Sequence, residues 1–481
     1  MKPDTPILHL NILDSPRKTS KPELAALLPA DFKGRNRDSN RGKVNLRIEG
    51  GHQLSGDVTL RTSKNAAVAL LCASLLNYGV TRFPRFPQIE EVFRMIEVLE
   101  SIGVVLEWMD NSTLEVRRPE KLQLENLDNE AAKVTRSILM LIGVLMHESK
   151  NFEIPNAGGC QLGQRTVEPH VDALAEFGVD VIEMCNQLRV TVNKCTPCEI
   201  TLHEAGNTVT NNVLLAAART FGETFIQAAS ADYMVQDLCF FLQKLGVGIE
   251  GIGTPLLRVK GAGRIQEHIT YSLTEDPIEA MFFITTAVVT DSEITIRRVP
   301  FRWISLELLK LKKMGLRYTM ANTCKASNGC ISLADLTIHR HKGCLQALSD
   351  KIHPNIWPGI NPDSLPYFVP IAAVAAGRTI IHDWMYDGRT VHYCEMAKLG
   401  VAIEMADPHR VYVEGPTKFH PPEEKLACPP ALRPATILLI SMLAANGVSV
   451  ISNIYTINRG YENLVARLNS LGAHVYAFYD D

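Results

Sequence analysis

One helix pattern, closed each time by a glycine, recurs six times along the chain and limits the folds open to it. In each copy apolar residues stand at i, i+3 and i+4, which predicts an amphipathic helix with one buried face. The glycine that follows can adopt a positive φ and end the helix, and an alternating strand pattern comes next. The six glycines are Gly103, Gly178, Gly246, Gly315, Gly400 and Gly472.

A second apolar helix and a β-branched strand precede each copy, so the predicted unit is helix–strand–helix–strand. The unit repeats about every 70–85 residues, which exceeds the roughly 20–50 residues of solenoid repeats. A chain of 481 residues is also too long for a single ordinary core. We therefore predict an α/β protein with two domains of three units each.

Composition and charge narrow the class of protein. The formal net charge is −3, which gives no reason to expect a nucleic-acid binder. The longest apolar run, Ile138–Met146, is far shorter than the roughly 20 residues of a membrane span, and the N-terminus lacks the pattern of a secretion signal. Eleven scattered cysteines suggest reduced thiols and a cytoplasmic location rather than a disulfide framework.

Two local segments stand outside the repeat. The close pair Cys195 and Cys198 lacks a second pair or histidines at the spacing of a zinc site, so we expect ordinary thiols and no metal. Residues 1–43 contain few periodic segments and include the polar, basic stretch Lys33–Lys43. We expect a flexible extension there, with a docking arm for a partner as the alternative.

Basic residues recur beside the starts of predicted helices, in loops rich in glycine and proline. A single arginine of this kind is usually a solvated surface charge, but the repetition predicts a positive cleft, which helix N-termini would reinforce. Arginine binds phosphate and carboxylate through paired hydrogen bonds, so the expected ligands are small polyanions. Asp363, an isolated carboxylate in this company, is a candidate general base. The basic residues are Lys64, Arg136, Arg165, Arg389, Arg433 and Arg459.

Cys160 is placed differently from a cysteine inside an apolar helix, such as Cys72. Gly158 and Gly159 precede it and give its loop conformational freedom. Arg165 follows five residues later, and a nearby cation lowers the pKa of a thiol. We therefore expect a reactive thiol at Cys160.

Seven motifs, in order and spacing, resemble those of the enolpyruvyl transferases that act on UDP-N-acetylglucosamine. They are SKNAA at 63–67, TRSI at 135–138, GGCQLGQRTVEPH at 158–170, HPNIWPGINPDS at 353–364, DGR at 387–389, LR at 432–433 and INRGYE at 457–462. The resemblance runs from about residue 44 to the C-terminus. It implies two inverse α/β (inside-out barrel) domains, each of three repeated units, hinged around an active-site cleft. Residues 44–63 with 275–481 would form a discontinuous catalytic domain, and residues 64–274 a second domain that carries the Cys160 loop.

By this resemblance, the chain transfers the enolpyruvyl group of phosphoenolpyruvate to an acceptor hydroxyl. C3 of phosphoenolpyruvate is protonated, the hydroxyl adds at C2, and phosphate is then eliminated. The resemblance implies no metal and no other cofactor, because basic side chains stabilise the anions. Cys160 matches the loop cysteine of the family, which can protonate C3 or bond to C2, and Asp363 matches the carboxylate thought to take the acceptor's proton.

The resemblance also assigns residues to the two substrates. The candidate catalytic residues are Cys160, Asp363, Lys64 and Arg433. The residues matched to phosphoenolpyruvate are Lys64, Arg136, Arg165, Arg389, Arg433 and Arg459, of which Arg389 and Arg459 match groups that follow closure of the cleft. The residues matched to the acceptor are Asn65, Arg165, Val167, Glu168, Gly206 and Asp363.

The acceptor side departs from the family pattern. The usual Arg-Pro-Val-Asp-Leu-His reads RTVEPH at 165–170, and ADY at 231–233 replaces Glu-Pro-Glu. Leu202 and Glu204 replace a lysine and a serine that are usual near the nucleotide phosphates, and Pro277 stands where an arginine is common. Losing a cation and gaining an anion near a diphosphate is unfavourable.

Several acceptors therefore remain open. UDP-N-acetylglucosamine, in the synthesis of peptidoglycan precursors, is the first. UMP or a related nucleotide is the alternative, since relatives in nucleoside-antibiotic pathways enolpyruvylate the 3′-hydroxyl of UMP. The shikimate-pathway relative fits less well because it lacks the loop cysteine, and a non-catalytic homologue that only binds a nucleotide is a further hypothesis. For both UDP-N-acetylglucosamine and UMP as acceptor, the expected partners are phosphoenolpyruvate and a uridine nucleotide. We expect no binding to nucleic acid or to a membrane.

Overall fold

The six repeat glycines all adopt the left-handed backbone conformation that the pattern predicts, with φ between 81° and 102°. In the computed structural model, which describes residues 43–156, 158, 166–341 and 345–479, each of these glycines follows a helix and precedes a strand. A side chain would be disfavoured at such positions, because L-residues rarely adopt a positive φ. The predicted helix–glycine–strand pattern is therefore confirmed.

Each unit forms its own small sheet, and the sheets contain more strands than the pattern predicts. The two predicted strands of a unit both pair with a third, antiparallel strand that lies between them. In five of the six sheets a fourth strand joins the first one in parallel. We refer to the three sheets formed by strands β3–β13 as lobe 1, and to the three formed by β1, β2 and β14–β23 as lobe 2.

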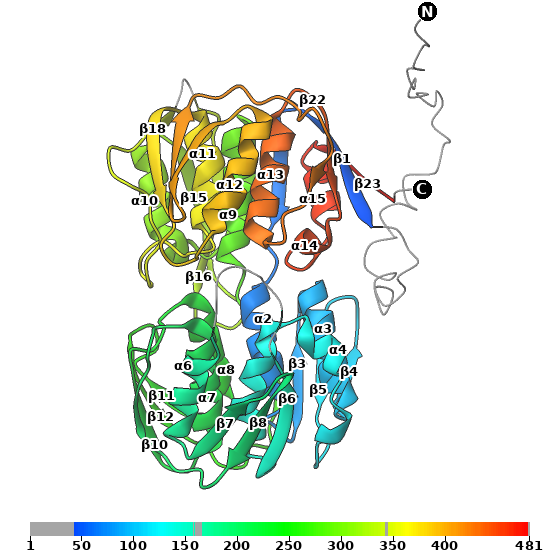
Figure 1. The fold of residues 1–481 in the computed structure, drawn as a ribbon, viewed down its shortest axis with the longest axis vertical. Helices are drawn as coiled ribbons and strands as arrows, with labels where there is room; N and C mark the ends of the chain where they lie inside the picture. The colour runs from blue at the N-terminus through cyan, green and yellow to red at the C-terminus, as the bar shows by residue number, and fades with distance from the viewer. Residues whose placement is uncertain (1–42, 157, 159–165, 342–344, 480–481) are drawn as a thin grey trace, which may run out of the picture. The chain divides into compact units, whose positions relative to one another are not determined.

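Lobe 1 follows the chain from α2 to β13, with 3₁₀ helices labelled η (Figure 1). Its elements are α2 Lys64–Ser74, β3 Val80–Phe83, α3 Glu90–Ser101, β4 Val105–Trp108, β5 Leu114–Arg117, η2 Leu124–Asn126, α4 Asn129–Lys133, η3 Arg136–Met140, α5 Leu141–Leu145, β6 Asn151–Pro155, α6 Glu168–Ala175, β7 Val179–Glu183, β8 Gln187–Val192, β9 Glu199–Thr201, α7 Asn207–Arg219, β10 Glu223–Gln227, α8 Tyr233–Lys244, β11 Gly248–Glu250, β12 Leu256–Lys260 and β13 His268–Thr270.

Lobe 2 takes two strands from before lobe 1 and the rest from after it. Its elements are β1 Val44–Gly50, β2 Ser55–Thr59, α9 Pro277–Val289, β14 Glu293–Val299, η4 Phe301–Ile304, α10 Ser305–Lys313, β15 Tyr318–Lys325, β16 Ser332–Ile338, β17 Leu345–Gln346, η5 Leu365–Tyr367, α11 Phe368–Val374, β18 Ala375–His382, α12 Arg389–Tyr393, η6 Cys394–Leu399, β19 Ala402–Asp407, β20 Arg410–Gly415, β21 Leu426–Ala427, α13 Leu432–Ala444, β22 Gly447–Ser452, α14 Tyr455–Asn458, α15 Leu464–Ser470 and β23 His474–Tyr479.

The helices lie inside each lobe and the sheets outside. Every residue of α9 is buried, and α9 packs against α11 and α13 (Figure 1). In lobe 1, α7 packs against α5 and α8, and α8 packs against α2. A helix that is mostly apolar on all sides is expected to be covered by other protein, so the predominantly apolar sequence of α9 places it at the centre of a core.

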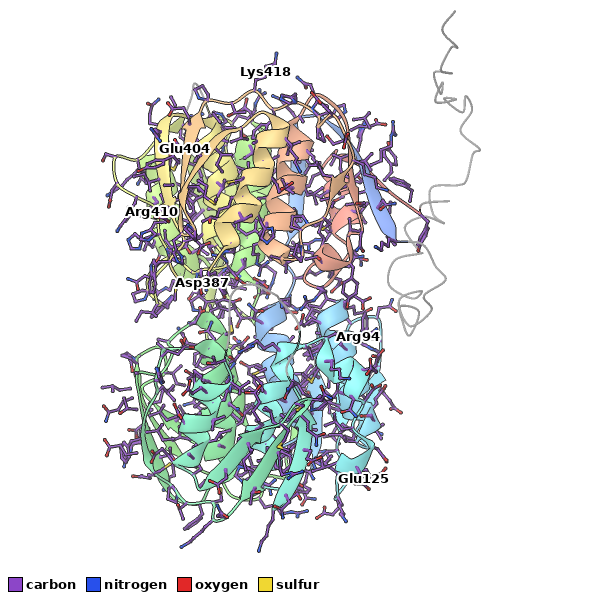
Figure 2. The ribbon with its side chains drawn as sticks, in the orientation of Figure 1. Arg94, Glu125, Asp387, Glu404, Arg410 and Lys418 are labelled. Atoms are coloured by element: carbon purple, nitrogen blue, oxygen red, sulfur yellow. The ribbon has the colours of Figure 1, made fainter. Side chains whose placement is uncertain are left out.

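The strands alternate between buried and exposed residues, as expected of sheets with one face on a core. Charged side chains such as Glu404, Arg410 and Lys418 lie on the outer surface (Figure 2). In the part of the chain that the structure describes, every helix is too short or too polar to reach across a membrane.

Strand β1 completes the last unit of lobe 2 from the opposite end of the chain. It takes the central position between β22 and β23, where Ile48 lies opposite Ser449 on one side and Val475 on the other. The side chain of Asn45 accepts a hydrogen bond from the backbone N–H of Asn453. Lobe 2 is therefore formed by discontinuous segments of the chain.

The described residues, from Lys43 onward, belong to one compact unit, and residues 1–42 lie outside the described residues. The extension expected over residues 1–43 lies outside the described residues, except for Lys43, so this expectation stays a prediction. The domain boundaries at 63/64 and 274/275 stay predictions.

Candidate active site

A cavity of about 650 Å³ is lined by residues of both lobes. Helices α2, α7, α8 and α13 all begin at its wall. Because a helix N-terminus carries a partial positive charge and unpaired N–H groups, their convergence favours an anionic ligand.

Most of the residues predicted from the sequence lie on this wall, but not all of them do. Those that line the cavity are Lys64, Asn65, Arg136, Gly206, Asp363, Arg389 and Arg433. Val167, Glu168 and Arg459 do not, although Thr166 and Pro169 beside the first two do. Cys160 and Arg165 lie outside the described residues, so their positions stay predictions.

Arg433 and Asp363 form an ion pair in the cavity wall. Arg433, the second residue of α13, donates from Nη2 to Oδ2 of Asp363 at 3.0 Å, and from Nη1 to the hydroxyl of Tyr461 at 2.9 Å. Burial alone would raise the pKa of Asp363, but the charges of Arg433, Arg389 and Lys64 hold it below the usual range. Asp363 is therefore ionised at neutral pH and can accept a proton.

Arg389 is fully buried and engages a carboxylate that sequence analysis missed. Its guanidinium donates to both oxygens of Asp383, at 2.5 and 2.9 Å, and to the carbonyl of Pro362 at 2.8 Å. Asp383 is itself fully buried and also accepts a hydrogen bond from Tyr393. Arg389 thus fixes the backbone directly before Asp363.

Glu91, in the first turn of α3, joins three parts of the predicted site. It accepts from Nη2 of Arg459 at 2.6 Å and from the hydroxyl of Thr135 at 2.9 Å, and it lies 4.0 Å from Nζ of Lys64. Although burial alone would raise the pKa of Glu91, Lys64 and Arg459 lower it. The sequence signal was weak, because acidic residues in the first turn of a helix are common caps. Arg459 itself lies at the C-terminal end of α14 and not at a helix start, so that part of the prediction was wrong.

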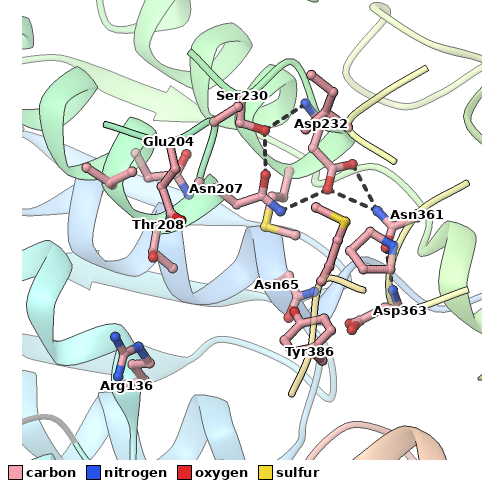
Figure 3. Close-up of a pocket in the computed structure, with 18 of the residues that line it drawn as sticks. Asn65, Arg136, Glu204, Asn207, Thr208, Ser230, Asp232, Asn361, Asp363 and Tyr386 are labelled. Carbon is pink, nitrogen blue, oxygen red and sulfur yellow. Dashed lines mark hydrogen bonds between the residues drawn. The ribbon is translucent and has the colours of Figure 1, made fainter. Parts of the chain in front are cut away.

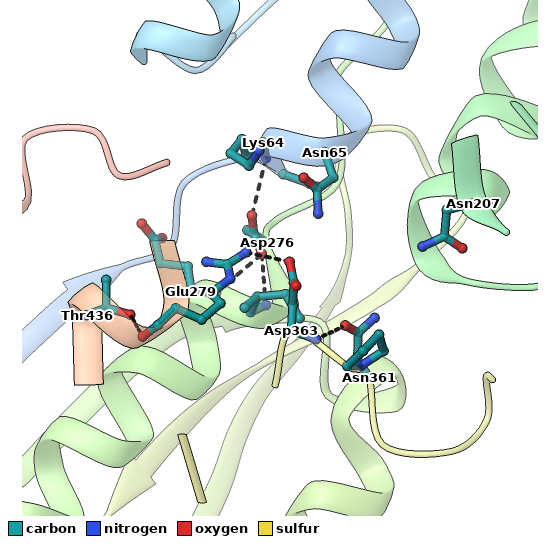
Figure 4. A network of polar contacts seen from close by, with 12 residues as sticks. Lys64, Asn65, Asn207, Asp276, Glu279, Asn361, Asp363 and Thr436 are labelled. Atoms are coloured by element: carbon teal, nitrogen blue, oxygen red, sulfur yellow. Dashed lines mark hydrogen bonds and ion pairs between the residues drawn. The ribbon is translucent and has the colours of Figure 1, made fainter. Parts of the chain in front are cut away.

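Asp276 was also missed and supports the start of two helices (Figure 4). Its Oδ1 accepts from the backbone N–H of Ile278 and caps α9, and its Oδ2 accepts from the backbone N–H of Lys64 at 3.2 Å. Burial raises the pKa of Asp276, and the charge of Arg433 opposes this shift. Lys64 therefore stands at the N-terminus of α2 with its backbone fixed.

The other side of the cavity is polar and includes carboxylates. Glu204, Thr208, Ser230 and Asp232 lie there, with Arg136 opposite (Figure 3). Arg136 donates from Nη2 to the carbonyl of Thr166 at 3.0 Å. We call this side, formed by residues 204–209, 211, 230 and 232, the acceptor wall, after the substrate to which the sequence resemblance matches Gly206.

Position 202 differs from what the family resemblance implies. The side chain of Leu202 is 3% exposed and packs in the core, so it does not face the cavity, whereas Glu204 does. Two changes were expected at this wall, the loss of a cation at position 202 and the gain of an anion at position 204. Only the second, Glu204, therefore alters the charge of the cavity.

His170 lines the cavity beside this wall and is neutral at pH 7. Burial lowers its pKa to about 4, and the charge of Arg136 adds to the shift. Its two ring nitrogens lie 3.0 Å from the amide of Asn212 and 3.4 Å from the hydroxyl of Thr208. Within the described ranges, no group of three or more His, Cys, Asp or Glu side chains is arranged to hold a metal ion, and the described cysteines are all free.

Comparison with known proteins gives one family. The model of the family described as EPSP synthase (3-phosphoshikimate 1-carboxyvinyltransferase) matches residues 48–468. The UDP-N-acetylglucosamine 1-carboxyvinyltransferase of Treponema pallidum is 30% identical over 430 residues, which cover 89% of this chain and 98% of that protein. The protein of the same name from Coprothermobacter proteolyticus is 30% identical over 441 residues, 91% of this chain and 98% of that protein.

Two solved structures show the fold. The enolpyruvyl transferase NikO from Streptomyces tendae superposes with a TM-score of 0.77 at 24% identity, over 92% of this chain and all of that one. An EPSP synthase from Acinetobacter baumannii gives 0.67 at 18% identity, over 90% of this chain and all of that one. The predicted fold of two inverse α/β domains, each with three repeated units, is therefore confirmed. The match over residues 48–468 means that this chain belongs to the EPSP synthase family of carboxyvinyl transferases.

Proposed function

We propose that the protein transfers the enolpyruvyl group of phosphoenolpyruvate to a hydroxyl of a uridine nucleotide and releases phosphate. The observation that carries this proposal is the pair of Arg433 and Asp363, which places an anion-binding guanidinium beside an ionised carboxylate in one cavity. The first group suits phosphoenolpyruvate, and the second suits an acceptor hydroxyl that must lose its proton.

The donor half of the proposal rests on charge. Lys64, Arg136 and Arg433 line the cavity, and the N-termini of α2 and α13 add partial positive charge. These groups would neutralise the phosphate and carboxylate of phosphoenolpyruvate, so that the reaction needs neither a metal nor an organic cofactor. In the addition step the thiol of Cys160 would give its proton to C3, while Asp363 takes the proton of the hydroxyl that bonds to C2. In the elimination step C3 gives a proton back to the Cys160 thiolate while the bond from C2 to the phosphate oxygen breaks, which re-forms the C2–C3 double bond and releases phosphate.

UDP-N-acetylglucosamine is the first candidate for the acceptor. Relatives that bear this activity in their names align with 89–91% of the chain at 30% identity. The product would then be a precursor of peptidoglycan. The cytoplasmic location predicted from the cysteines agrees with such a role.

UMP or another nucleotide with fewer phosphates is a second candidate, and Glu204 favours it. Glu204 lines the cavity as part of the acceptor wall, where its carboxylate would repel a diphosphate more than a monophosphate. The fold is also close to that of NikO, an enolpyruvyl transferase, although likeness at 24% identity shows the fold alone.

The experiment is phosphate release from phosphoenolpyruvate with UDP-N-acetylglucosamine, UMP or shikimate 3-phosphate as acceptor, with the product identified by mass. Release with the first supports the cell-wall reaction, and release with UMP alone supports the second candidate. No release with either uridine nucleotide contradicts the proposal and favours a protein that only binds nucleotides.

Glu204→Ser separates the two acceptors further. Leu202 stays unchanged, because a lysine there would bury an ammonium group in the core. If Glu204 repels a diphosphate, the variant gains about 5- to 150-fold in kcat/KM for UDP-N-acetylglucosamine relative to UMP, as about 1–3 kcal/mol implies. An unchanged ratio would mean that Glu204 has no part in the choice of acceptor.

A further inference from the structure

Asp232 links the acceptor wall of lobe 1 to the loop of lobe 2 that carries Asp363. It is buried at the N-terminus of α8, where Oδ1 accepts from the backbone N–H of Tyr233 at 2.7 Å. Its Oδ2 accepts from the amide of Asn207 at 2.8 Å. Both oxygens also lie within hydrogen-bond distance of the side-chain amide of Asn361, at 3.0 and 3.1 Å (Figure 3).

Asn361 uses every polar atom of its side chain in this arrangement. Its Nδ2 donates to Asp232, and its Oδ1 accepts from the backbone N–H of Asp363 at 2.8 Å. Its own backbone N–H donates to Oε1 of Glu307 at 3.2 Å. The position thus requires a donor toward one lobe and an acceptor toward Asp363, and an amide is a side chain that offers both.

We propose that Asp232 and Asn361 form a clasp that positions Asp363 for proton transfer from the acceptor hydroxyl. Asp232 and Asn361 are positioning residues, since they act through the Asp363 loop. The inference rests on the proposed function in so far as Asp363 is the group that takes the proton. It goes further by making the geometry of Asp363 depend on a contact with the acceptor wall.

The charges around Asn361 explain why an amide, rather than a second carboxylate, faces Asp232. Burial raises the pKa of Asp232 to about 6, with the negative charge of Asp363 adding to the shift, and burial raises the pKa of Glu307 to about 7. A fourth carboxylate, at position 361, would face Asp232 with no proton to donate. An amide instead satisfies both neighbours without adding charge.

The clasp also reaches the substrate side through Asn207. The first residue of α7, Asn207, donates to Asp232 and accepts from the hydroxyl of Ser230 at 2.5 Å, and both Asn207 and Ser230 line the cavity. A chain of hydrogen bonds therefore runs from the acceptor wall through Asp232 and Asn361 to Asp363.

Exchange of the two residues tests the clasp. Asp232→Asn replaces the carboxylate that accepts with an amide, and Asn361→Asp replaces the amide that donates with a carboxylate, so each change breaks the match between donor and acceptor. Each single variant is expected to lower kcat about 10- to 100-fold. The KM for phosphoenolpyruvate is expected to change less than about 3-fold. The double variant D232N/N361D restores one amide facing one carboxylate, and the carboxylate introduced at position 361 could still accept from the backbone N–H of Asp363. The double variant is expected to recover kcat to within about 3-fold of the wild type.

A control and a readout that does not depend on turnover accompany the exchange. Asn446→Asp adds the same charge at an exposed position of lobe 2 that does not line the cavity, and it is expected to leave kcat unchanged. The fluorescence of Trp357, four residues before Asn361, is expected to shift in both single variants and to return in the exchange.

The outcomes separate this inference from the proposed function. Single variants that behave like the wild type, or an exchange in which the two losses simply add, would overturn the clasp, because non-additivity is the signature of a direct contact. If the wild type releases no phosphate with any acceptor, the proposed function fails, and the fluorescence series alone decides whether the clasp exists. Unfolding curves of all variants identify any loss that comes from misfolding.

Discussion

Asp363→Asn is expected to slow turnover while it tightens the binding of phosphoenolpyruvate. The substitution keeps the shape of the side chain and removes its charge. If Asp363 takes the proton of the acceptor hydroxyl, kcat falls by about 10²- to 10⁴-fold, the usual contribution of a general base. The same change removes a negative charge that competes with the substrate for Arg433.

The size of the binding effect follows from the geometry. Two unit charges 3.0 Å apart, the distance from Asp363 Oδ2 to Arg433 Nη2, attract by about 5.5 kcal/mol at an effective dielectric constant of about 20. A substrate anion on Arg433, about 6 Å from Asp363, would be repelled by roughly half of this. Because the Asp363 side chain is 25% exposed, solvent screening reduces the repulsion to about 1 kcal/mol, or about 5-fold in affinity.

The assay measures the two quantities separately. The dissociation constant of phosphoenolpyruvate comes from tryptophan fluorescence without acceptor, and kcat from phosphate release at saturation. Asp387→Asn is the matched control, since Asp387 is 71% exposed and does not line the cavity. A variant that binds phosphoenolpyruvate more weakly than the wild type, or that keeps its kcat, would refute the assignment of Asp363.

Three further outcomes are expected. Fosfomycin, an epoxide that resembles phosphoenolpyruvate, alkylates Cys160, and peptide mapping that finds the adduct on another cysteine would contradict the assignment. Gly158→Ala lowers kcat, because the added Cβ would lie 1.5 Å from the carbonyl oxygen of Lys133 and position 158, two residues before Cys160, would have to shift. An unchanged kcat would contradict this expectation. Burial raises the pKa of Glu307 from 4.5 to about 7. Between these two pH values Glu307 stays protonated in the folded protein but is ionised in the unfolded chain, so the free energy of unfolding falls as the pH rises from 4.5 to 7. Glu307→Gln removes this titration. In denaturant unfolding, the free energy of unfolding of the variant minus that of the wild type should therefore rise by up to about 3 kcal/mol between pH 4.5 and 8. A difference that does not change with pH would contradict the raised pKa.

Local patterns in the sequence predicted the repeated units, but they did not predict which strands pair over long distances along the chain. The helix that ends at Gly246 is specified by its own apolar period and its own glycine, so it needs no partner to be recognised. Strand β1 has an equally strong strand sequence, but nothing in it indicates that it pairs with β22 about 400 residues later. The short parallel strands, such as β17 with two residues, are set by tertiary contacts and give no period to detect.

The same distinction holds for the site. Lys64, Arg136, Arg389 and Arg433 stand at helix starts, as the local pattern predicts, and their functional roles stay predictions. Their partners were not predicted, because the pairing of Arg389 with a carboxylate, or of Arg433 with Asp363, depends on which loops meet in space. A buried carboxylate such as Asp383 looks in the sequence like any surface acid.

The discontinuous construction of lobe 2 has a consequence for how the chain folds as it is made. Strand β1 leaves the ribosome long before its neighbours β22 and β23, which follow it by roughly 400 residues. At about 5–20 residues per second, the intervening stretch of roughly 400 residues takes about 20–80 s to synthesise. All strands of lobe 1 have by then been made and can pair among themselves, whereas β1 still has two unpaired edges. During translation, therefore, both edges of β1 stay open to wrong pairing until β22 and β23 have been made, and protection of this strand by a chaperone would prevent such pairing.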